Sequence, residues 1–550
     1  MTTSDLQRWL SLVDRETDGR PDRLRVAAPD APPIEPLYTE AVELTVPQRA
    51  SACLVGTIVA VGPDSIRHIE ADASGGADFC LLVARAGAPP MPDDVRKAVA
   101  AAQSHGLQVG WAGSPDIARV LVGLPDVAAG MDASAAITMG PGELAECCAG
   151  DRPAATFVVD GGAAYESGGN EVHALGSAVA QMWSLVRTGS DQGVRPADIL
   201  HAADYRLRAG RNFVLTVAML RAMRLLHARV CEAAGAAAGA ARIEVLSSRR
   251  DFTVLDPWSN LIRGTVGAAA AMIGGADRVI VLPGDEPATA AGGPSDLMRR
   301  AARNTLLVAR HEARLDWVTN PADGSWAFDA LTARMASMAW ELASAIDDAG
   351  GAFSDAGRAL LQARIDVVRT VRAKGIGSRA WSIIGANEYA SAASSVEFDG
   401  AAFDLPGTTD DHGWLTLRQR ALGVGSSAAV TLLLLDEPST MRVRLDWVHG
   451  LLACAGLAAE PCTLADLESE HPPAVRPAVV LVGPDAAWTH VGRAVESVHA
   501  VRGPAHVALA GRPAETAPFT EAGVDAFIHV GAPLLTLLET MVTRCTEVSA

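Results

Sequence analysis

Short apolar runs alternate with long amphipathic segments between about residues 49 and 390. The segments 211–231 and 329–349 place apolar side chains on one stripe at helical spacing, which predicts helices. Several short runs are almost wholly apolar, as expected for strands covered on both faces. The predicted strands are 53–60, 79–84, 107–112, 156–160, 243–247 and 279–283. Successive βα units of this length and order predict an α/β fold with a (β/α)8 TIM barrel over residues 49–390.

A second, smaller βα pattern follows at residues 428–550. Its predicted strands and helices are 430–435, 443–455 (helix), 479–482, 507–510, 527–530 and 534–545 (helix). This pattern predicts a doubly wound, flavodoxin-like sheet of about five strands. Residues 391–427 lose periodicity and are rich in Ser, Gly, Asp and Thr. We therefore expect a linker between the two domains.

The first 48 residues form a different kind of segment. A short amphipathic stretch, 6–13, precedes a proline-rich path that cannot be regular helix. This predicts an extended arm, which has little to bury against itself and lies along a partner subunit or its own barrel. We take Pro36, Leu37 and Tyr38 as candidates for contacts with a partner.

Charge and cysteine content narrow the function classes. The formal charge of −18 repels nucleic acid and anionic membranes, so we expect neither as a partner. The chain starts with polar residues rather than a secretory signal, and no apolar run is long enough to span a bilayer. The eight cysteines show neither metal-ligand spacing nor a disulfide framework. We expect a cytoplasmic globular protein without a metal site.

The most specific motif lies between two predicted strands. It reads Asp-Pro-Trp-Ser-Asn-Leu-Ile-Arg at 256–263, followed by Gly-Gly-Ala-Asp at 274–277. Asp256 and Pro257 suit a helix start, and the glycine pair suits its end. Other polar residues of this region, and two carboxylates in or near strands, are either structural hydrogen-bonding groups or ligand contacts, and we favour the structural role. They are Asn260, Arg263, Arg303, Asn304, Asp160 and Glu244.

These motifs, together with the runs 34–39, 299–305 and 320–326, resemble the methylmalonyl-CoA mutase family. The signature residues are Asp256, Pro257, Asn260, Arg263, Gly275, Asp277 and Asn304. The resemblance implies a barrel followed by a cobalamin-binding-domain-like module. It also implies an adenosylcobalamin-dependent isomerase that interconverts methylmalonyl-CoA and succinyl-CoA in propionate metabolism, with the cofactor supplying the radical chemistry.

The sequence departs from the family where chemistry is expected. Cobalamin-binding members carry an Asp-x-His-x-x-Gly turn whose histidine ligates cobalt. Here the turn begins at Asp436, with Pro438 in place of the histidine and Met441 in place of the glycine. Neither His449 nor His471 is a good substitute, and the family's second glycine motif is replaced by Gly-Arg-Pro at 511–513. We therefore expect a degenerate turn that binds no cofactor.

The barrel segment departs in the same way. The family's Arg-Thr-His-Cys-Gln-Thr-Ser run corresponds to Ser-Ser-Arg-Arg-Asp-Phe at 247–252, and arginine cannot replace a histidine that titrates near neutrality. Its Arg-Gln-Tyr-Ala-Gly-Phe segment has no counterpart between residues 50 and 75. We therefore expect no catalytic residue in this chain.

Three functions follow from the resemblance and its gaps. The favoured one is a non-catalytic small subunit that stabilises a large subunit, which holds both adenosylcobalamin and the acyl-CoA substrate. The alternatives are a self-sufficient acyl-CoA mutase with divergent ligands, and a regulatory or interaction protein that kept only the fold.

Overall fold

The computed structural model describes most of the chain. The described residues are 3–27, 29–122, 124, 127–148, 157–237, 239–289, 293–390, 403–405, 407–425 and 428–547. Contacts divide the chain into two compact units, each described by itself below. Unit 1 comprises Met1–Phe252, Asn260–Arg369 and Phe398–Thr408; unit 2 comprises Thr253–Ser259, Thr370–Glu397 and Thr409–Ala550. Among the described helices, none is both long and apolar enough to cross a membrane.

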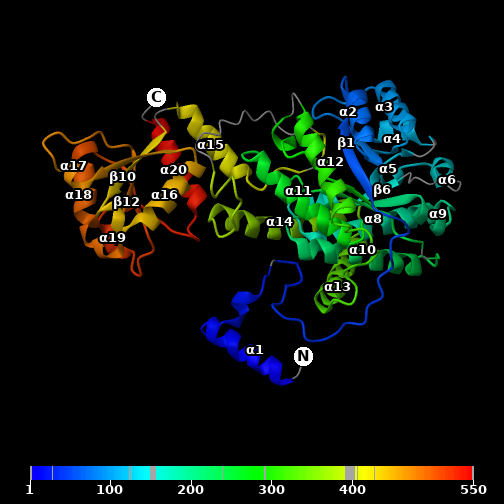
Figure 1. Cartoon of the computed structure of the whole chain (residues 1–550), viewed down its shortest axis with the longest axis horizontal. Helices are drawn as coiled ribbons and strands as arrows, with labels where there is room; N and C mark the ends of the chain where they lie inside the picture. The colour runs from blue at the N-terminus through cyan, green and yellow to red at the C-terminus, as the bar shows by residue number, and fades with distance from the viewer. Residues whose placement is uncertain are drawn as a thin grey trace. The chain divides into compact units, whose positions relative to one another are not determined.

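Unit 1 contains a curled sheet of nine parallel strands, ordered β4-β3-β2-β1-β9-β8-β7-β6-β5 (Figure 1). The strands are β1 (Leu54–Ala60), β2 (Phe79–Val83), β3 (Gln108–Ala112), β4 (Val127–Ala128), β5 (Met131–Asp132), β6 (Phe157–Asp160), β7 (Ala203–Ala209), β8 (Ile243–Ser247) and β9 (Arg278–Ile280). The prediction of a parallel α/β sheet is confirmed, and all six predicted strands of this region have counterparts. Residue 156, the first of one predicted strand, lies outside the described residues.

The sequence analysis missed β4, β5 and β7. β4 and β5 are only two residues each, which is too short for a periodic signal. β7 alternates charged and apolar side chains, with Asp204, Arg206 and Arg208 on one face and Tyr205 and Leu207 on the other. Such alternation usually marks a strand with one solvent-exposed face. In this sheet both faces of β7 are buried.

Helices separate the strands of unit 1. They are α1 (Thr3–Glu16), α2 (Ser65–Ser74), α3 (Pro92–Ser104), α4 (Pro115–Leu121), α5 (Ala133–Ala136), α6 (Pro141–Cys148), α7 (Gly162–Glu166), α8 (Glu171–Asp191), α9 (Pro196–His201), α10 (Phe213–Ala233), α11 (Pro257–Ile273), α12 (Asp296–His311), α13 (Trp326–Asp348) and α14 (Asp355–Gly377); α11 begins and α14 ends among residues assigned to unit 2. The two predicted helices correspond to α10 and α13. One apolar core lies between strands and helices, and a second, smaller one lies on the opposite face of the sheet.

The N-terminal arm contacts the surface of its own unit. After α1, the chain forms a short bridge between Val26 and Ile34. The side-chain amide of Asn170, at the start of α8, donates to the carbonyl oxygens of Pro29 and Asp30 at 2.9 Å each. Ile34 and Tyr38 pack half-buried against the main core. Of the two expectations for the arm, contact with its own barrel therefore has direct support.

Unit 2 contains a five-stranded parallel sheet, ordered β11-β10-β12-β13-β14. Its elements are α15 (His412–Val424), β10 (Ala429–Leu434), α16 (Arg442–Cys454), β11 (Ala458–Thr463), α17 (Leu464–Leu467), β12 (Ala478–Val482), α18 (Val491–Arg502), β13 (His506–Ala510), α19 (Ala517–Glu521), β14 (Ala526–Ile528) and α20 (Leu534–Glu547). All four predicted strands are present. The unassigned fifth, β11, is an edge strand that contains Pro461 and is largely exposed, so it lacks the apolar signal of a central strand.

The segment predicted as a linker is not irregular throughout. Residues 412–424 form α15, which buries Trp414, Leu415 and Leu417. Its residues Trp414, Leu417, Ala421 and Val424 recur at helical spacing, so the helix was missed because the Ser-, Gly-, Asp- and Thr-rich residues before it were extended through it. Within the predicted linker, residues 391–402, 406 and 426–427 lie outside the described residues.

A buried histidine on α10 makes the stability of unit 1 depend on pH. The His227 ring lies 3.0 Å from the Tyr205 hydroxyl of β7, and burial lowers the pKa of His227 from 6.5 to about 4. Because the unfolded chain binds the proton more readily, the stability contributed by neutral His227 is complete above pH 6.5 and is lost as the pH falls toward 4. At about 1.4 kcal/mol per pH unit, the loss approaches roughly 3 kcal/mol.

We expect His227→Gln to flatten the dependence of the unfolding free energy on pH between 6.5 and 4, as measured by urea denaturation. His449→Gln, at an exposed position of α16, serves as the control and should leave that dependence unchanged. A His227→Gln profile as steep as that of the unmodified chain would contradict this assignment.

Candidate functional site

The inner face of the unit 1 sheet is filled by buried ion pairs. Arg206 donates to Glu244 at 2.6 Å, and Arg208 approaches Asp160 at 3.2 Å. Nearer the start of the strands, Arg278 pairs with Asp204. All these side chains are buried except that of Asp160, which is partly so. The inner face of the sheet is therefore packed with the chain's own paired side chains.

Arg249 closes the carboxyl end of the same sheet. Its guanidinium group pairs twice with Glu286, at 2.6 and 3.0 Å. It also donates to the carbonyl oxygens of Phe403 and Leu405, at 2.9 and 2.6 Å. The Glu286 carboxylate in turn accepts from the Phe403 backbone amide at 3.1 Å. One arginine thus joins the loops after β8 and β9 to a segment more than 150 residues away.

Phe403 acts as a plug at this end of the sheet. Its side chain is 1% exposed and packs in the inner apolar cluster with Phe79, Leu246 and Phe252. The plug segment, residues 403–405, forms a bridge with Arg85 and donates from the amide of residue 404 to a carbonyl oxygen just beyond β2. Barrel active sites are built at the carboxyl ends of the strands, and here Phe403 fills part of that end. A cavity of about 220 Å³ remains beside it, lined by Ala60, Arg85 and Phe403 among others.

Arg250 has a structural role of its own. Its guanidinium group stacks 3.7 Å from the centre of the Tyr165 ring and donates to the carbonyl oxygen of Gly169 at 2.8 Å. Its backbone amide donates to Glu166 at 3.0 Å, and burial raises the pKa of the Glu166 carboxyl. Both arginines that stand in the family's histidine-containing run are therefore held in buried structural contacts.

The signature residues lie where they support the fold. Asp256 accepts from the Ser259 amide at 3.2 Å at the start of α11, and Pro257 is the first residue of that helix. Asn260 donates to the carbonyl oxygen of Gly284 at 2.7 Å and accepts from Arg263 at 2.8 Å.

The remaining signature residues follow α11 or lie on α12. Gly275 has a φ of +85°, which glycine adopts without strain. Asp277 accepts from the Ile243 amide at 2.8 Å and pairs with Arg224. Asn304 is exposed on α12, in contrast to the buried Asn260. The contacts of this group favour the structural role.

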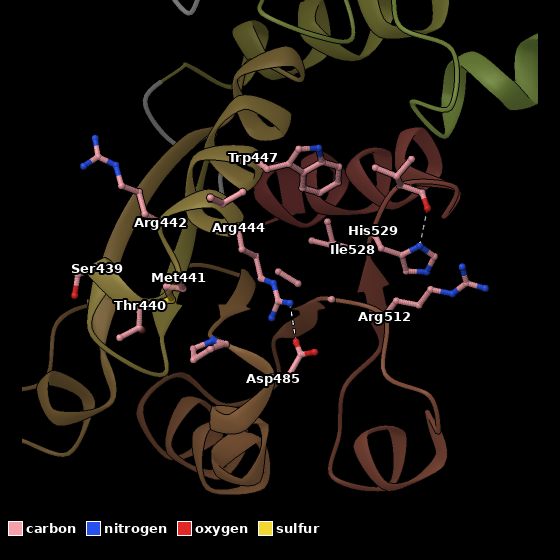
Figure 2. Close-up of a pocket in the computed structure, with 15 residues that line it drawn as sticks. Ser439, Thr440, Met441, Arg442, Arg444, Trp447, Asp485, Arg512, Ile528 and His529 are labelled. Atoms are coloured by element: carbon pink, nitrogen blue, oxygen red, sulfur yellow. Dashed lines mark hydrogen bonds and ion pairs between the residues drawn. The ribbon is translucent and has the colours of Figure 1, made fainter. Parts of the chain in front are cut away.

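The degenerate turn lies at the carboxyl end of β10 in unit 2. Asp436 accepts from the Glu437 amide at 2.8 Å and from the Thr440 hydroxyl at 3.1 Å, so its carboxylate stabilises the turn itself. Pro438 begins a short 3₁₀ turn, and Met441 is buried just before α16. The turn borders a crevice of about 710 Å³ formed at the ends of β10, β12, β13 and β14 (Figure 2).

One histidine in this crevice was missed by the sequence analysis. His529 follows β14 directly and lies 2.9 Å, through its Nδ1, from the carbonyl oxygen of Val530. Its position just after a parallel strand could have marked His529 as a site residue. The predicted strand, however, extended to residue 530 and so included this histidine. β14 is three strands from β10 in the sheet, or about 14 Å at the usual spacing. His529 therefore does not replace a ligand at the turn after β10.

The residues do not fit a cobalt ligand set at that turn. Proline offers no lone pair to a metal, and His449 and His471 are exposed and do not line the crevice. Within the described part of the chain, no cluster of three or more His, Cys, Asp or Glu side chains could hold a metal ion.

Part of the chain is similar to a known protein family. Residues 142–409 match the family model for methylmalonyl-CoA mutase. The match covers slightly less than half of the chain. The matched region includes the signature residues, Arg249, Glu286 and the plug segment.

Among the relatives are small subunits of mutases. The chain is 33% identical over 333 residues to a probable methylmalonyl-CoA mutase small subunit of Mycobacterium tuberculosis, covering 58% of this chain and 52% of that protein. It is 35% identical over 249 residues to the small subunit of Streptomyces virginiae, covering 45% and 40%. The alignments thus span about half the length of these relatives or less.

A comparison of structures adds nothing to this argument. A truncated 3-deoxy-D-arabino-heptulosonate 7-phosphate synthase from Thermotoga maritima aligns with a TM-score of 0.26 and 11% identity, over 51% of this chain and 94% of that one.

Breaking the buried ion pair of Arg249 and Glu286 should be costly. We expect Glu286→Gln to lower the unfolding free energy by about 3–5 kcal/mol, because it leaves Arg249 buried without its counter-charge. The matched control is Asp198→Asn, which breaks the pair with the mostly exposed Arg195 and should cost about 1 kcal/mol or less. Equal losses in urea denaturation would show that the closure does not stabilise unit 1.

Proposed function

We propose that this chain is the non-catalytic small subunit of a heterodimeric, adenosylcobalamin-dependent methylmalonyl-CoA mutase. The observation that carries the proposal lies at the carboxyl end of the sheet, where Phe403 and the Arg249–Glu286 pair occupy much of the place of a barrel active site. The similarity to mutase small subunits supports the same role. The whole enzyme would isomerise methylmalonyl-CoA and succinyl-CoA in the cytoplasm as part of propionate metabolism.

The proposal includes a finer description of both folds. β4 and β5 are separated by two residues; β4 pairs with β3, and β5 pairs with β6. Counted as one kinked strand they supply the eighth member of a ring, since β1 also pairs with β9. We therefore assign unit 1 a (β/α)8 TIM barrel. The order of the unit 2 sheet is that of flavodoxin-like, cobalamin-binding-domain-like folds.

The proposed organisation has four parts. An arm at 1–48 precedes a barrel domain at 49–390, a connecting region at 391–427 that includes α15, and a degenerate cobalamin-binding-like domain at 428–550. The family signature within the barrel serves its architecture, because the contacts of residues such as Asp256, Asn260 and Asp277 are internal to the chain.

We assign adenosylcobalamin and the acyl-CoA substrate to the large subunit. The turn after β10 has no imidazole, and Asp436 is bonded within the turn rather than to a histidine. A histidine bound to cobalt would in any case be poorly oriented without a carboxylate that accepts from its other ring nitrogen. We assign no catalytic, cofactor-binding or metal-binding residue to this chain.

We expect the purified chain alone neither to bind adenosylcobalamin nor to convert methylmalonyl-CoA, and activity to appear when the large subunit of the same organism is added. Spectrophotometric titration of the cofactor and a coupled assay measure both. In the assembled enzyme, Pro438→Ala should leave kcat unchanged, because the turn does not position the cofactor. Turnover by the isolated chain would contradict the proposal.

The arm supplies candidate contacts with the large subunit. Pro36 is exposed, and Leu37 and Tyr38 are half-exposed. The Tyr38 hydroxyl accepts from the Glu35 amide at 3.1 Å. We expect Leu37→Asp to weaken association with the large subunit at least about tenfold, since it places a charge in an apolar contact. Leu297→Asp, at an exposed position of α12, is the control. Unchanged affinity of Leu37→Asp in calorimetry would remove the arm from the interface.

A further inference from the structure

The crevice of unit 2 keeps the size and place of a ligand site. Its volume of about 710 Å³ lies within the range of small-molecule pockets. It opens at the carboxyl ends of the strands, where β10 is paired with β11 on one side and β12 on the other. Chain connections leave β10 in opposite directions at this point, and doubly wound sheets bind ligands at such switch points.

The charge of the crevice is opposite to that of the chain. Its lining holds three arginines, Arg442, Arg444 and Arg512, and one carboxylate, Asp485, in a chain of net charge −18. Asp485 lies 2.7 Å from Arg444 and fixes its guanidinium group at the centre of the crevice (Figure 2). This arrangement favours an anionic ligand.

The three arginines differ in what they can reach. Arg512, on the loop after β13, extends beside His529 at the rim (Figure 2). Arg442 is largely exposed, lies 3.7 Å from Asp446 and points away from the crevice (Figure 2). Arg444 and Arg512 are therefore the two cations that an anion in the crevice would meet.

The rest of the wall is apolar and partly aromatic. Trp447 lies above Arg444 and His529, and its ring also stacks on Arg379 at 5.0 Å (Figure 2). Ile528 forms the floor, and Val443 and Val530 are 86% and 57% exposed at the edge. The flat aromatic ring of a ligand can stack on this apolar surface. A small inorganic anion would leave the surface exposed to water.

The start of α16 adds donors at the same place. Met441 precedes this helix and supplies no side-chain cap to its first amides. The start of a helix favours phosphate groups, and here its first residues line the crevice that holds the two arginines. This feature supplements the cavity and its charges and does not stand alone.

We propose that the unit 2 crevice binds a nucleoside diphosphate, with the diphosphate at Arg444, Arg512 and the start of α16 and the base against Trp447. The proposal goes beyond the subunit role, since it needs neither the large subunit nor cobalamin. The charged groups of the crevice bind the diphosphate, and the aromatic wall binds the base. A ligand that carries only the diphosphate or only the nucleoside should therefore bind less well.

The test is calorimetric titration of the full chain with ADP, adenosine and inorganic diphosphate at low salt. We expect ADP to bind at least about tenfold more tightly than either half-ligand, and Arg512→Gln to weaken ADP binding by about tenfold or more. Val530→Glu, which places a negative charge at the edge, should weaken it as well. Arg493→Gln, at an exposed ion pair on α18, is the matched control and should have no effect.

Three results would overturn the proposal. They are the absence of ADP binding, binding of ADP no tighter than that of diphosphate or adenosine, and ADP binding that survives both Arg512→Gln and Val530→Glu. Because Arg512 and Val530 are exposed, both variants should fold, and their thermal unfolding midpoints verify this.

Discussion

The buried pair of Arg249 and Glu286 is the contact on which the character of this chain depends. Two unlike charges removed from water need each other and further hydrogen bonds to offset the cost of burial. Here the further bonds come from the backbone of the plug segment, which carries Phe403 into the inner apolar cluster. The same arginine that satisfies the buried carboxylate therefore closes the end of the sheet.

These contacts fit the proposed role of a subunit without catalytic residues. Barrel active sites are built at the carboxyl ends of the strands. In this chain Arg249, Glu286 and Phe403 occupy part of that end, and the Arg206–Glu244 pair is buried on the inner face of the sheet. Selection for stability and for partner binding can act on such a core without constraint from a substrate. The crevice of unit 2 differs, since its volume remains although its turn carries Pro438.

Much of the fold could be predicted from the sequence, and the reasons for the exceptions are physical. Apolar runs identified the buried strands, whereas β7 was missed because its charges are paired inside the sheet rather than solvated. The position of Pro438 in a turn after β10 was predictable because a turn after a strand is local in sequence. The plug was not, because the contact of Arg249 with Phe403 joins residues 154 apart and follows no periodicity. His529 was missed because the end of a short strand was misplaced.

A non-catalytic subunit of the proposed kind gives no nitrogen ligand to cobalt. Electron paramagnetic resonance of cob(II)alamin in the assembled enzyme tests it most directly, with only this chain labelled with nitrogen-15. The account predicts the triplet splitting of an unlabelled nitrogen from the large subunit. A doublet from nitrogen-15 would show that an imidazole of this chain coordinates the metal, and would contradict the account.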